Sequence, residues 1–289
     1  DSTDGSQAVA HAAGARVLNL DLMRPFTAAR ARLEGAEALF VANPKLTYVQ
    51  FVDGDCTLAP AWIPAAHRFL EENQGYAVAC GRRRERSPGS SPYNATADLE
   101  WDTQVGDADA CGGDALFRIA AYRAVGGFDA ALIAGEEPEL CTRLRSAGWQ
   151  IRRLDIEMTV HDAAMTRLSQ WWNRAVRSGF GYAQAWQATR MGKHALYRRE
   201  LLRASVWTLS PVALSIVAGL AIHPAAWLIA PLVYAAQIAR LAMKFGATHV
   251  FSWQRAGLLT LGKAAEAWGA LVYFKRCAAG AIGDTISYK

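Results

Sequence analysis

The sequence predicts an α/β domain, with a mostly parallel sheet and helices on both faces, followed by an apolar helical region. Two observations lead to this fold class. Short β-branched or aromatic segments alternate with helix-like segments up to about residue 190, the order that βαβ units produce. Beyond Leu201 the chain becomes strongly apolar. We therefore expect an α/β domain over residues 1–190 and a membrane-associated helical region over residues 191–289.

The amino-terminal residues predict a turn and a helix where such a domain normally begins with a buried strand. Asp4 belongs to a polar turn of helix-capping residues, and residues 7–13 are helical in composition. Residues 15–20 then predict a short strand. Because an α/β domain normally places a strand before such a turn, we interpret the chain as a fragment that lacks its first strand.

The next segments continue the alternation of helix and strand. They predict a helix over residues 27–42, a buried strand over 46–52, a helix over 60–73 and a strand over 76–80. Four arginines follow the last of these strands, beside Ser, Pro and Gly: Arg82, Arg83, Arg84 and Arg86. Two interpretations of this cluster stay open, a solvated loop or a contact with the phosphates of a substrate or an anionic lipid.

The second half of the domain is less regular. Residues 98–113 have no clear period, and a Gly-Gly pair ends a helical stretch over residues 115–124. The remaining segments predict a helix over residues 136–147, strands over 149–154 and 157–160, and an amphipathic helix over 166–187. The helix over 136–147 is the clearest of these, because Glu139 and Arg143 are four residues apart and Gly148 follows as a stop signal.

Two apolar segments, residues 204–222 and 225–243, are each close to the length that a membrane-spanning helix requires. His223-Pro224 separates them, and arginine or lysine flanks their outer ends. This charge distribution predicts a hairpin with both ends in the cytoplasm. The alternative is a buried helical pair in a soluble protein. Residues 256–274 carry internal charge and predict an interfacial helix rather than a third span.

Net charge and cysteine content exclude several classes of protein. The formal net charge is only +5, and no Lys/Arg run alternates with aromatic residues on a recognition helix, so nucleic acid is not an expected partner. The five cysteines include no C-x-x-C pair and are odd in number. This pattern argues against a disulfide framework or a zinc site and favours a reducing compartment.

Asp53 and Asp55 form the first candidate for chemistry. They follow the predicted buried strand over residues 46–52, and the carboxyl edge of an open α/β sheet is where ligands bind. Their oxygens suit Mg²⁺ or Mn²⁺, which would neutralise a departing diphosphate. A second D-x-D, Asp107-Ala108-Asp109, lacks a preceding strand, so context separates the two. The alternative for Asp53 and Asp55 is a surface turn.

Glu136 and Glu137 open the helix over residues 136–147. Acidic residues at a helix start are commonly favourable partners of the helix dipole. The functional alternative is general-base catalysis, in which a carboxylate takes the proton of an attacking hydroxyl.

Two further motifs are ambiguous on sequence alone. Cys111-Gly112-Gly113-Asp114 is either a ligand-approaching loop or a plain tight turn. His161 follows a strand-like segment and is either a structural residue or a metal ligand suited to Mn²⁺.

A pair of tryptophans and two arginines mark the predicted helix over residues 166–187. Arg174 and Arg177 could hold diphosphate oxygens. Trp171 and Trp172 could line a sugar, lie at a membrane interface or simply pack in the core.

Taken in order, these motifs resemble the family 2 glycosyltransferases, which have the GT-A fold. The resemblance covers about residues 1–190. The matching segments are Ser2-Thr3-Asp4-Gly5-Ser6, Ala31-Arg32-x-x-Gly35, Phe51-Val52-Asp53-Gly54-Asp55, Gly112-Gly113-Asp114, Gly126-Gly127-Phe128-Asp129 and Gly135-Glu136-Glu137-x-Glu139-Leu140-x-x-Arg143-Leu144-x-x-x-Gly148. The trailing apolar hairpin is similar to that of membrane-associated bacterial members.

The resemblance implies an inverting, hexosyltransferase-type transfer from a nucleotide-diphospho-sugar, with Mg²⁺ or Mn²⁺ as cofactor. It implies a cytoplasmic catalytic domain on the bacterial inner membrane, in polysaccharide or glycolipid synthesis, with a glycan or lipid-linked acceptor. The implied roles are donor binding by Asp4, Arg32, Asp53, Asp55 and Arg174, metal binding by Asp53, Asp55 and His161, catalysis by Glu137 with Glu136, and acceptor binding by Gly113, Asp114 and Trp172.

The chain departs from the family pattern in three ways. The first strand is missing, Leu33 stands where Asn is frequent, and Glu137 replaces the usual Asp. The first two departures favour an alternative, a non-catalytic membrane-bound module that binds sugar nucleotides or polysaccharide. A nucleotidyltransferase is a third class, but no Gly-rich basic loop precedes Asp53.

Overall fold

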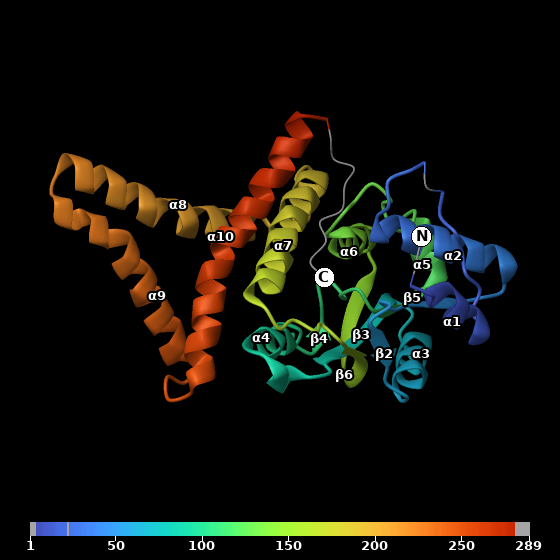
Figure 1. Ribbon diagram of the computed structural model, residues 1–289. Coiled ribbons are helices and arrows are strands. Elements are labelled where there is room, and N and C mark those ends of the chain that lie inside the picture. Colours follow the sequence, from blue (N-terminus) through green and yellow to red (C-terminus); the bar gives the residue numbers. More distant parts are fainter. Residues whose placement is uncertain (1–3, 22, 281–289) are drawn as a thin grey trace.

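The structure is a computed structural model that describes residues 4–21 and 23–280. Figure 1 shows an α/β body and, beside it, long helices that extend away from the sheet. The strands are β1 (Tyr48–Phe51), β2 (Cys56–Leu58), β3 (Tyr76–Glu85), β4 (Gly106–Asp107), β5 (Ala115–Arg118) and β6 (Gln150–His161). The α-helices are α1 (Ser6–Ala12), α2 (Ala28–Ala42), α3 (Trp62–Glu72), α4 (Pro92–Glu100), α5 (Ile119–Ala124), α6 (Glu136–Ser146), α7 (Leu168–Thr189), α8 (Arg198–Ala221), α9 (Ile229–Phe245) and α10 (Val250–Ala278).

The predicted α/β class is confirmed, but the sheet is not mostly parallel. Its order is β1-β5-β3-β6-β2, and β4 pairs with β6. Among the described residues, β3–β6 is the only parallel pair. Although β1, β3 and β6 run in one direction, β5 lies antiparallel between β1 and β3.

The direction of β5 follows from where its segment enters the sheet. Ala115 pairs with Phe51, the last residue of β1, so β5 begins at the edge where β1 ends. Asp114, the residue just before β5, adds a contact at this edge by accepting a 2.8 Å hydrogen bond from the Asp53 backbone N–H. A strand that starts at this edge has to run back across the sheet, and it is therefore antiparallel to β1.

Several local predictions were wrong. Residues 15–20 form no strand, and their side chains are exposed or half-buried, so no burial favours strand pairing there. The predicted arginine loop is the second half of β3, held by parallel pairing to β6. The stretch over 115–124 begins as β5 and becomes α5 only at Ile119, while α4 lies in a segment that had no predicted helix.

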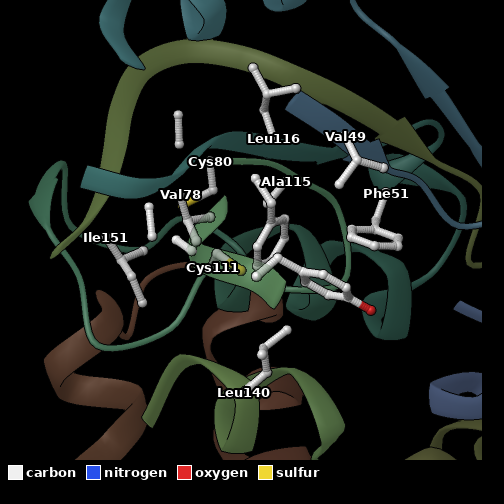
Figure 2. Close-up of a cluster of buried hydrophobic side chains, with 14 of the residues drawn as sticks. Val49, Phe51, Val78, Cys80, Cys111, Ala115, Leu116, Leu140 and Ile151 are labelled. Atoms are coloured by element: carbon white, nitrogen blue, oxygen red, sulfur yellow. The ribbon is translucent and has the colours of Figure 1, made fainter. Parts of the chain in front are cut away.

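The core of the body lies between the sheet and the helices that cover it. Figure 2 shows buried apolar side chains of β1, β3 and β5, with Val78 and Ala115 on the side of the sheet that faces Leu140 of α6 and Leu116 on the other side. Aromatic rings continue this core, because Phe51 packs edge-to-face on Phe117 and Phe128 with ring centroids 5.4 and 5.1 Å apart. The end of β1 and Leu140 of α6 therefore belong to the same core.

The apolar region is a helical hairpin joined to the body by α10. Figure 1 shows α8 and α9 leading away from the sheet and α10 lying beside α7. Residues 198–221 and 224–245 are long and apolar enough to cross a membrane, and only 22% and 6% of an apolar 18-residue stretch in each is buried. These helices contain the predicted segments 204–222 and 225–243 almost entirely. The proposed boundary at residue 190 stays a prediction, and the α7–α10 contact crosses it.

Candidate active site

Most of the predicted site residues line one cavity at the edge where β1, β3 and β6 end. The cavity has a volume of about 450 Å³. Its floor is formed by residues at these strand ends, and its walls by the start of α6 and by α7. The lining residues used below are Arg32, Asp53, Asp55, Arg83, Trp101, Gly113, Glu136, Glu137, His161, Arg174, Arg177, Tyr182 and Tyr197.

Asp53, just beyond β1, is held between two arginines. Its Oδ1 lies 2.5 Å from Arg32 Nη2, and its Oδ2 accepts a 3.1 Å bond from Arg83. Burial alone would raise the pKa of Asp53, but the two guanidinium groups lower it below its ordinary value. Asp53 is therefore a carboxylate whose two oxygens are both occupied by arginine in this structure.

Asp114 supports this arrangement from behind. It has no exposed surface, accepts from the Asp53 backbone, and its Oδ2 accepts from the Thr159 hydroxyl at 2.8 Å. Arg83 Nη2 lies 2.6 Å from the same Oδ2. Gly113 permits this close packing, since a Cβ on it would lie 2.8 Å from Asp53 Oδ2.

Arg32 of α2 connects the end of β1 to the start of α6. While one end of its guanidinium contacts Asp53, Nη1 donates a 2.5 Å hydrogen bond to Glu136 Oε1. Burial acts against the charge of Arg32, but Asp53 and Glu136 raise its pKa above the ordinary value. The ion pair therefore commits the Glu136 carboxylate to Arg32.

Asp55 and His161 form a pair with the chemistry of a divalent metal site. β2 pairs with the end of β6, which places Cys56 opposite His161 and brings His161 Nε2 within 3.4 Å of Asp55 Oδ1. Asp55, Cys56 and His161 all offer ligand atoms within 4.8 Å of one another. Carboxylate and imidazole suit Mn²⁺, whereas the Cys56 sulfur is a softer ligand than Mn²⁺ prefers.

The surroundings of His161 also fit a metal ligand. Glu85 Oε2 lies 3.7 Å from His161 Nδ1, on the ring nitrogen opposite to the one that faces Asp55. A carboxylate behind a ligating histidine orients the ring and increases its basicity. Asp55 and His161 therefore fit a divalent ion better than Asp53, whose oxygens both contact arginine.

Glu137 is the other acidic residue at the start of α6, and neutral groups hold it. It is 7% exposed, and its Oε1 accepts from the Cys111 N–H at 2.6 Å and from the Cys141 thiol at 3.0 Å. Gly135 allows α6 to begin here, because it has a φ of 80° and lies against Gly181 of α7. Unlike Glu136, Glu137 contacts no cation in these bonds.

Helix α7 supplies the wall across from the strand ends. Arg174 donates a 2.8 Å hydrogen bond to Glu100 and lies above the Trp101 ring, with its guanidinium 6.0 Å from the ring centroid. Trp101 in turn packs 4.8 Å from the His161 ring. Trp101 thus lies between Arg174 of α7 and His161.

Three predicted residues do not line the cavity. Asp4 is exposed and accepts from Ser6 in the amino-terminal turn. Trp172 packs in a separate apolar cluster that contains Trp171. Asp114 lies behind Asp53, as described above. The second D-x-D lies elsewhere too, since Asp107 pairs with Arg152 on the exposed side of β6.

Sequence analysis missed two kinds of residue in the cavity. Arg83 was grouped with an arginine loop, and only the length of β3 shows that it points into the site while Arg82 and Arg84 bind Asp98. Tyr197 sits in a left-handed turn before α8, with a φ of 56°, and no sequence signal indicated its contact with the cavity. A strand alternation continued through the arginines would have identified Arg83.

The fold and this cavity together define an α/β protein of the GT-A type. No protein-family model matches the chain, and no curated protein matches it in sequence. Among solved structures, the mannosyltransferase PcManGT from Pyrobaculum calidifontis, in complex with GDP-Man and Mn²⁺, is similar with a TM-score of 0.53. It is 18% identical, and the match covers 93% of this chain and 75% of that one. This likeness establishes the fold.

Two other solved structures are more distant. A mycobacterial protein has a TM-score of 0.45 and 19% identity, over 65% of this chain and 62% of its own. GalNAc-T7 with UDP, GalNAc and Mn²⁺ has a TM-score of 0.39 and 12% identity, over 74% and 48% of the two chains. At these scores neither adds to the argument.

Proposed function

We propose that this chain is a metal-dependent glycosyltransferase that moves a sugar, with inversion, from a nucleotide-diphospho-sugar to a hydroxyl acceptor. One observation carries the proposal: Asp53, Asp55, His161 and the two glutamates of α6 line one cavity at the strand ends of a GT-A-type fold. The chemistry requires a cation for the diphosphate and a carboxylate near the acceptor, and the cavity has side chains that could hold the cation as well as carboxylates that could act as the base.

The donor diphosphate would lie between Asp55, His161 and the arginines of the cavity. Asp55 and His161 would hold Mn²⁺ or Mg²⁺, which supplies charge neutralisation for the departing nucleoside diphosphate. Mn²⁺ is favoured by the imidazole nitrogen, and the solved mannosyltransferase with this fold binds GDP-Man and Mn²⁺. Arg83 and Arg32 currently neutralise Asp53, and either could turn to a phosphate oxygen.

Glu137 is the proposed general base. Its carboxylate is held by an N–H and a thiol, so it can take a proton without first breaking an ion pair. The Glu136 carboxylate is bound to Arg32, and we assign it to positioning the arginine between α2 and α6. We revise the role of Asp114 from acceptor contact to support of Asp53, because the side chain is fully buried.

The acceptor side supports a membrane location. Tyr197 lines the cavity and is the residue before α8, so the cavity reaches the base of the apolar hairpin. We propose a family 2 enzyme on the cytoplasmic face of a bacterial inner membrane, with a glycan or lipid-linked acceptor and a role in surface polysaccharide or glycolipid synthesis. The exposed apolar faces of α8 and α9 support the membrane part of this proposal.

A non-catalytic module that binds sugar nucleotides is the second candidate. One feature favours it, because both oxygens of Asp53 contact arginines. A donor phosphate could then be bound only by a metal that Asp55 and His161 hold. Such a module would bind a donor with metal but would neither hydrolyse nor transfer it.

The test is a panel of UDP-, GDP- and dTDP-sugars, measured for binding and hydrolysis with Mn²⁺, with Mg²⁺ and with chelator. A glycosyltransferase binds one nucleotide class in a metal-dependent way and slowly hydrolyses that donor without an acceptor. Binding with no turnover, even with lipid extract supplied as acceptor, would select the non-catalytic module. If neither binding nor hydrolysis of any donor depends on the metal, both the glycosyltransferase and the non-catalytic module are rejected.

A further inference from the structure

The proposed base, Glu137, belongs to a second group of potential metal ligands, in which two of the three ligand atoms are cysteine sulfurs. Cys111 precedes the Gly-Gly loop, Cys141 lies one helical turn after Glu137 on α6, and all three side chains are buried. Their ligand atoms lie within 4.8 Å of one another. No local pattern groups these residues, because 29 residues separate the two cysteines and neither belongs to a C-x-x-C pair.

The spacing of these atoms is close to that of a tetrahedral zinc site. Zinc–sulfur bonds of about 2.3 Å and zinc–oxygen bonds of about 2.1 Å place two sulfurs about 3.8 Å apart, and a sulfur and an oxygen about 3.6 Å apart. The Cys111 and Cys141 sulfurs are 3.6 Å apart, and Cys141 Sγ is 3.0 Å from Glu137 Oε1. To take three of the four ligand positions, the two sulfurs would move apart by about 0.2 Å, and Cys141 Sγ and Glu137 Oε1 by about 0.6 Å.

The cluster also has an entry path. Glu137 and Gly113 both line the cavity, so a cation in the cavity reaches the carboxylate first and the sulfurs behind it. A water molecule on the cavity side would take the fourth position. Without a metal, the cluster is held by the bond from the Cys141 thiol to Glu137, which a metal would replace as both thiols release their protons.

We propose that Cys111, Cys141 and Glu137 form a binding site for a thiophilic divalent cation such as Zn²⁺, separate from the site of Asp55 and His161. Thiolate ligands select zinc over Mg²⁺ and Mn²⁺, so the softness of the ligands determines which cation each site binds. Bound there, zinc holds Glu137 as a ligand and removes the base. The inhibition rests on the proposed function, whereas binding does not.

The binding test uses Cd²⁺, whose bonds to thiolates give a charge-transfer absorption, in the presence of excess Mn²⁺ to fill the hard site. The chain carries Cys56→Ser and Cys277→Ser, because these two are the only cysteines that are not fully buried. We expect one Cd²⁺ per chain, displaced by Zn²⁺. Adding Cys141→Ser, which keeps a hydroxyl donor for Glu137, weakens binding by about tenfold or more.

Cys80→Ser is the matched control, since Cys80 is equally buried but lies outside the cluster. It should leave Cd²⁺ affinity unchanged. If Cys141→Ser does not fold by circular dichroism, Glu137→Gln tests the same site with a weaker ligand. No thiolate absorption in the folded parent chain, or equal losses with Cys80→Ser and Cys141→Ser, would overturn the site.

Inhibition is measured on donor hydrolysis at fixed Mn²⁺. Zn²⁺ should inhibit the parent chain at concentrations about tenfold or more below those needed for Cys141→Ser, each relative to its own uninhibited rate. Cd²⁺ binding in a chain that hydrolyses no donor would keep the site and reject the enzyme. Activity that is equally zinc-sensitive in both chains would keep the enzyme and reject the inhibitory role.

Discussion

The cavity and the α8–α9 hairpin differ in which side chains they bury and which they expose to water. Around the cavity, charged side chains are buried, and the structure pairs them: Asp114 has no exposed surface and contacts Arg83 at 2.6 Å. On the hairpin, large apolar side chains are exposed, and the chain provides little to cover them. The exposed ones on α8 and α9 include Leu202, Val206, Leu209, Val212, Leu214, Ile216, Val217, Leu220 and Leu232.

The difference shows whether the groups that stabilise each region come from the chain itself or from outside it. A buried charge is tolerated only with an opposite charge or a hydrogen bond, and the cavity supplies both from within the chain. Exposed apolar helices of this length need an apolar surrounding that is not part of the chain. The charged side chains of the cavity therefore suit a polar ligand, and the exposed apolar side chains of the hairpin suit a lipid or protein surface.

The largest expected effect is at the metal-type pair. Asp55→Asn should lower metal-dependent donor turnover by about a thousandfold or more, because metal stabilisation of several kcal/mol is lost. Asp107→Asn is the matched control, since it changes the other D-x-D at an exposed position away from the cavity. Turnover and Mn²⁺ binding measure both. Full activity of Asp55→Asn in a folded chain would remove the metal role from this residue.

The next effect separates the two glutamates of α6. Glu137→Gln should lower transfer by about 10²- to 10⁴-fold while leaving donor binding intact, as expected for loss of a general base. Glu136→Gln removes the carboxylate bound to Arg32 and should act more on donor KM than on kcat. The KM and kcat of both variants decide the assignment. If Glu136→Gln loses kcat and Glu137→Gln does not, the base is Glu136.

The third prediction addresses the hairpin. Leu214 is 56% exposed near the middle of α8, and an arginine at the centre of a span costs about 2.5–3.5 kcal/mol. Leu214→Arg should therefore reduce the partition coefficient of the protein between liposomes and water by about a hundredfold. Donor hydrolysis should stay nearly unchanged. Val41→Arg, at an 80% exposed position on α2, is the control and should have no effect.

Flotation of both variants with liposomes gives the answer. Equal flotation of Leu214→Arg and the parent chain would mean that α8 does not enter the bilayer. A change in sedimentation mass without a change in flotation would identify a second protein chain as the covering surface.

The site was predictable where a local pattern had a structural context. Asp53 and Asp55 follow a β-branched, aromatic strand, and Glu136 and Glu137 open a well-marked helix, so their places at one edge followed from the alternation of elements. The roles of these residues stay predictions until the variants are measured. The two long apolar helices were also predictable, because length and hydropathy alone define them, whereas their place in a membrane stays a prediction.

Pairing over long sequence distances was not predictable. The direction of β5 follows from its pairing with β1 and β3, far away in the sequence, and a one-sequence pattern carries no such information. The two tryptophans show a smaller limit. Consecutive helical residues lie on different faces, so Trp171 is buried while Trp172 is only partly so, and composition could not say which lines a ligand.

The smallest expected effect tests how the two regions are joined. A Cβ on Gly269 of α10 would lie 1.9 Å from the Val176 carbonyl oxygen of α7, so Gly269→Ala should force the helices apart and destabilise the protein by about 1–3 kcal/mol. Gly257 lies on the same helix with open space around it, and Gly257→Ala should stabilise by up to about 1 kcal/mol through helix propensity. Urea unfolding in detergent compares them. Equal shifts would show that α10 does not pack on α7 in solution, and the hairpin would then be linked to the cavity only through the segment that contains Tyr197.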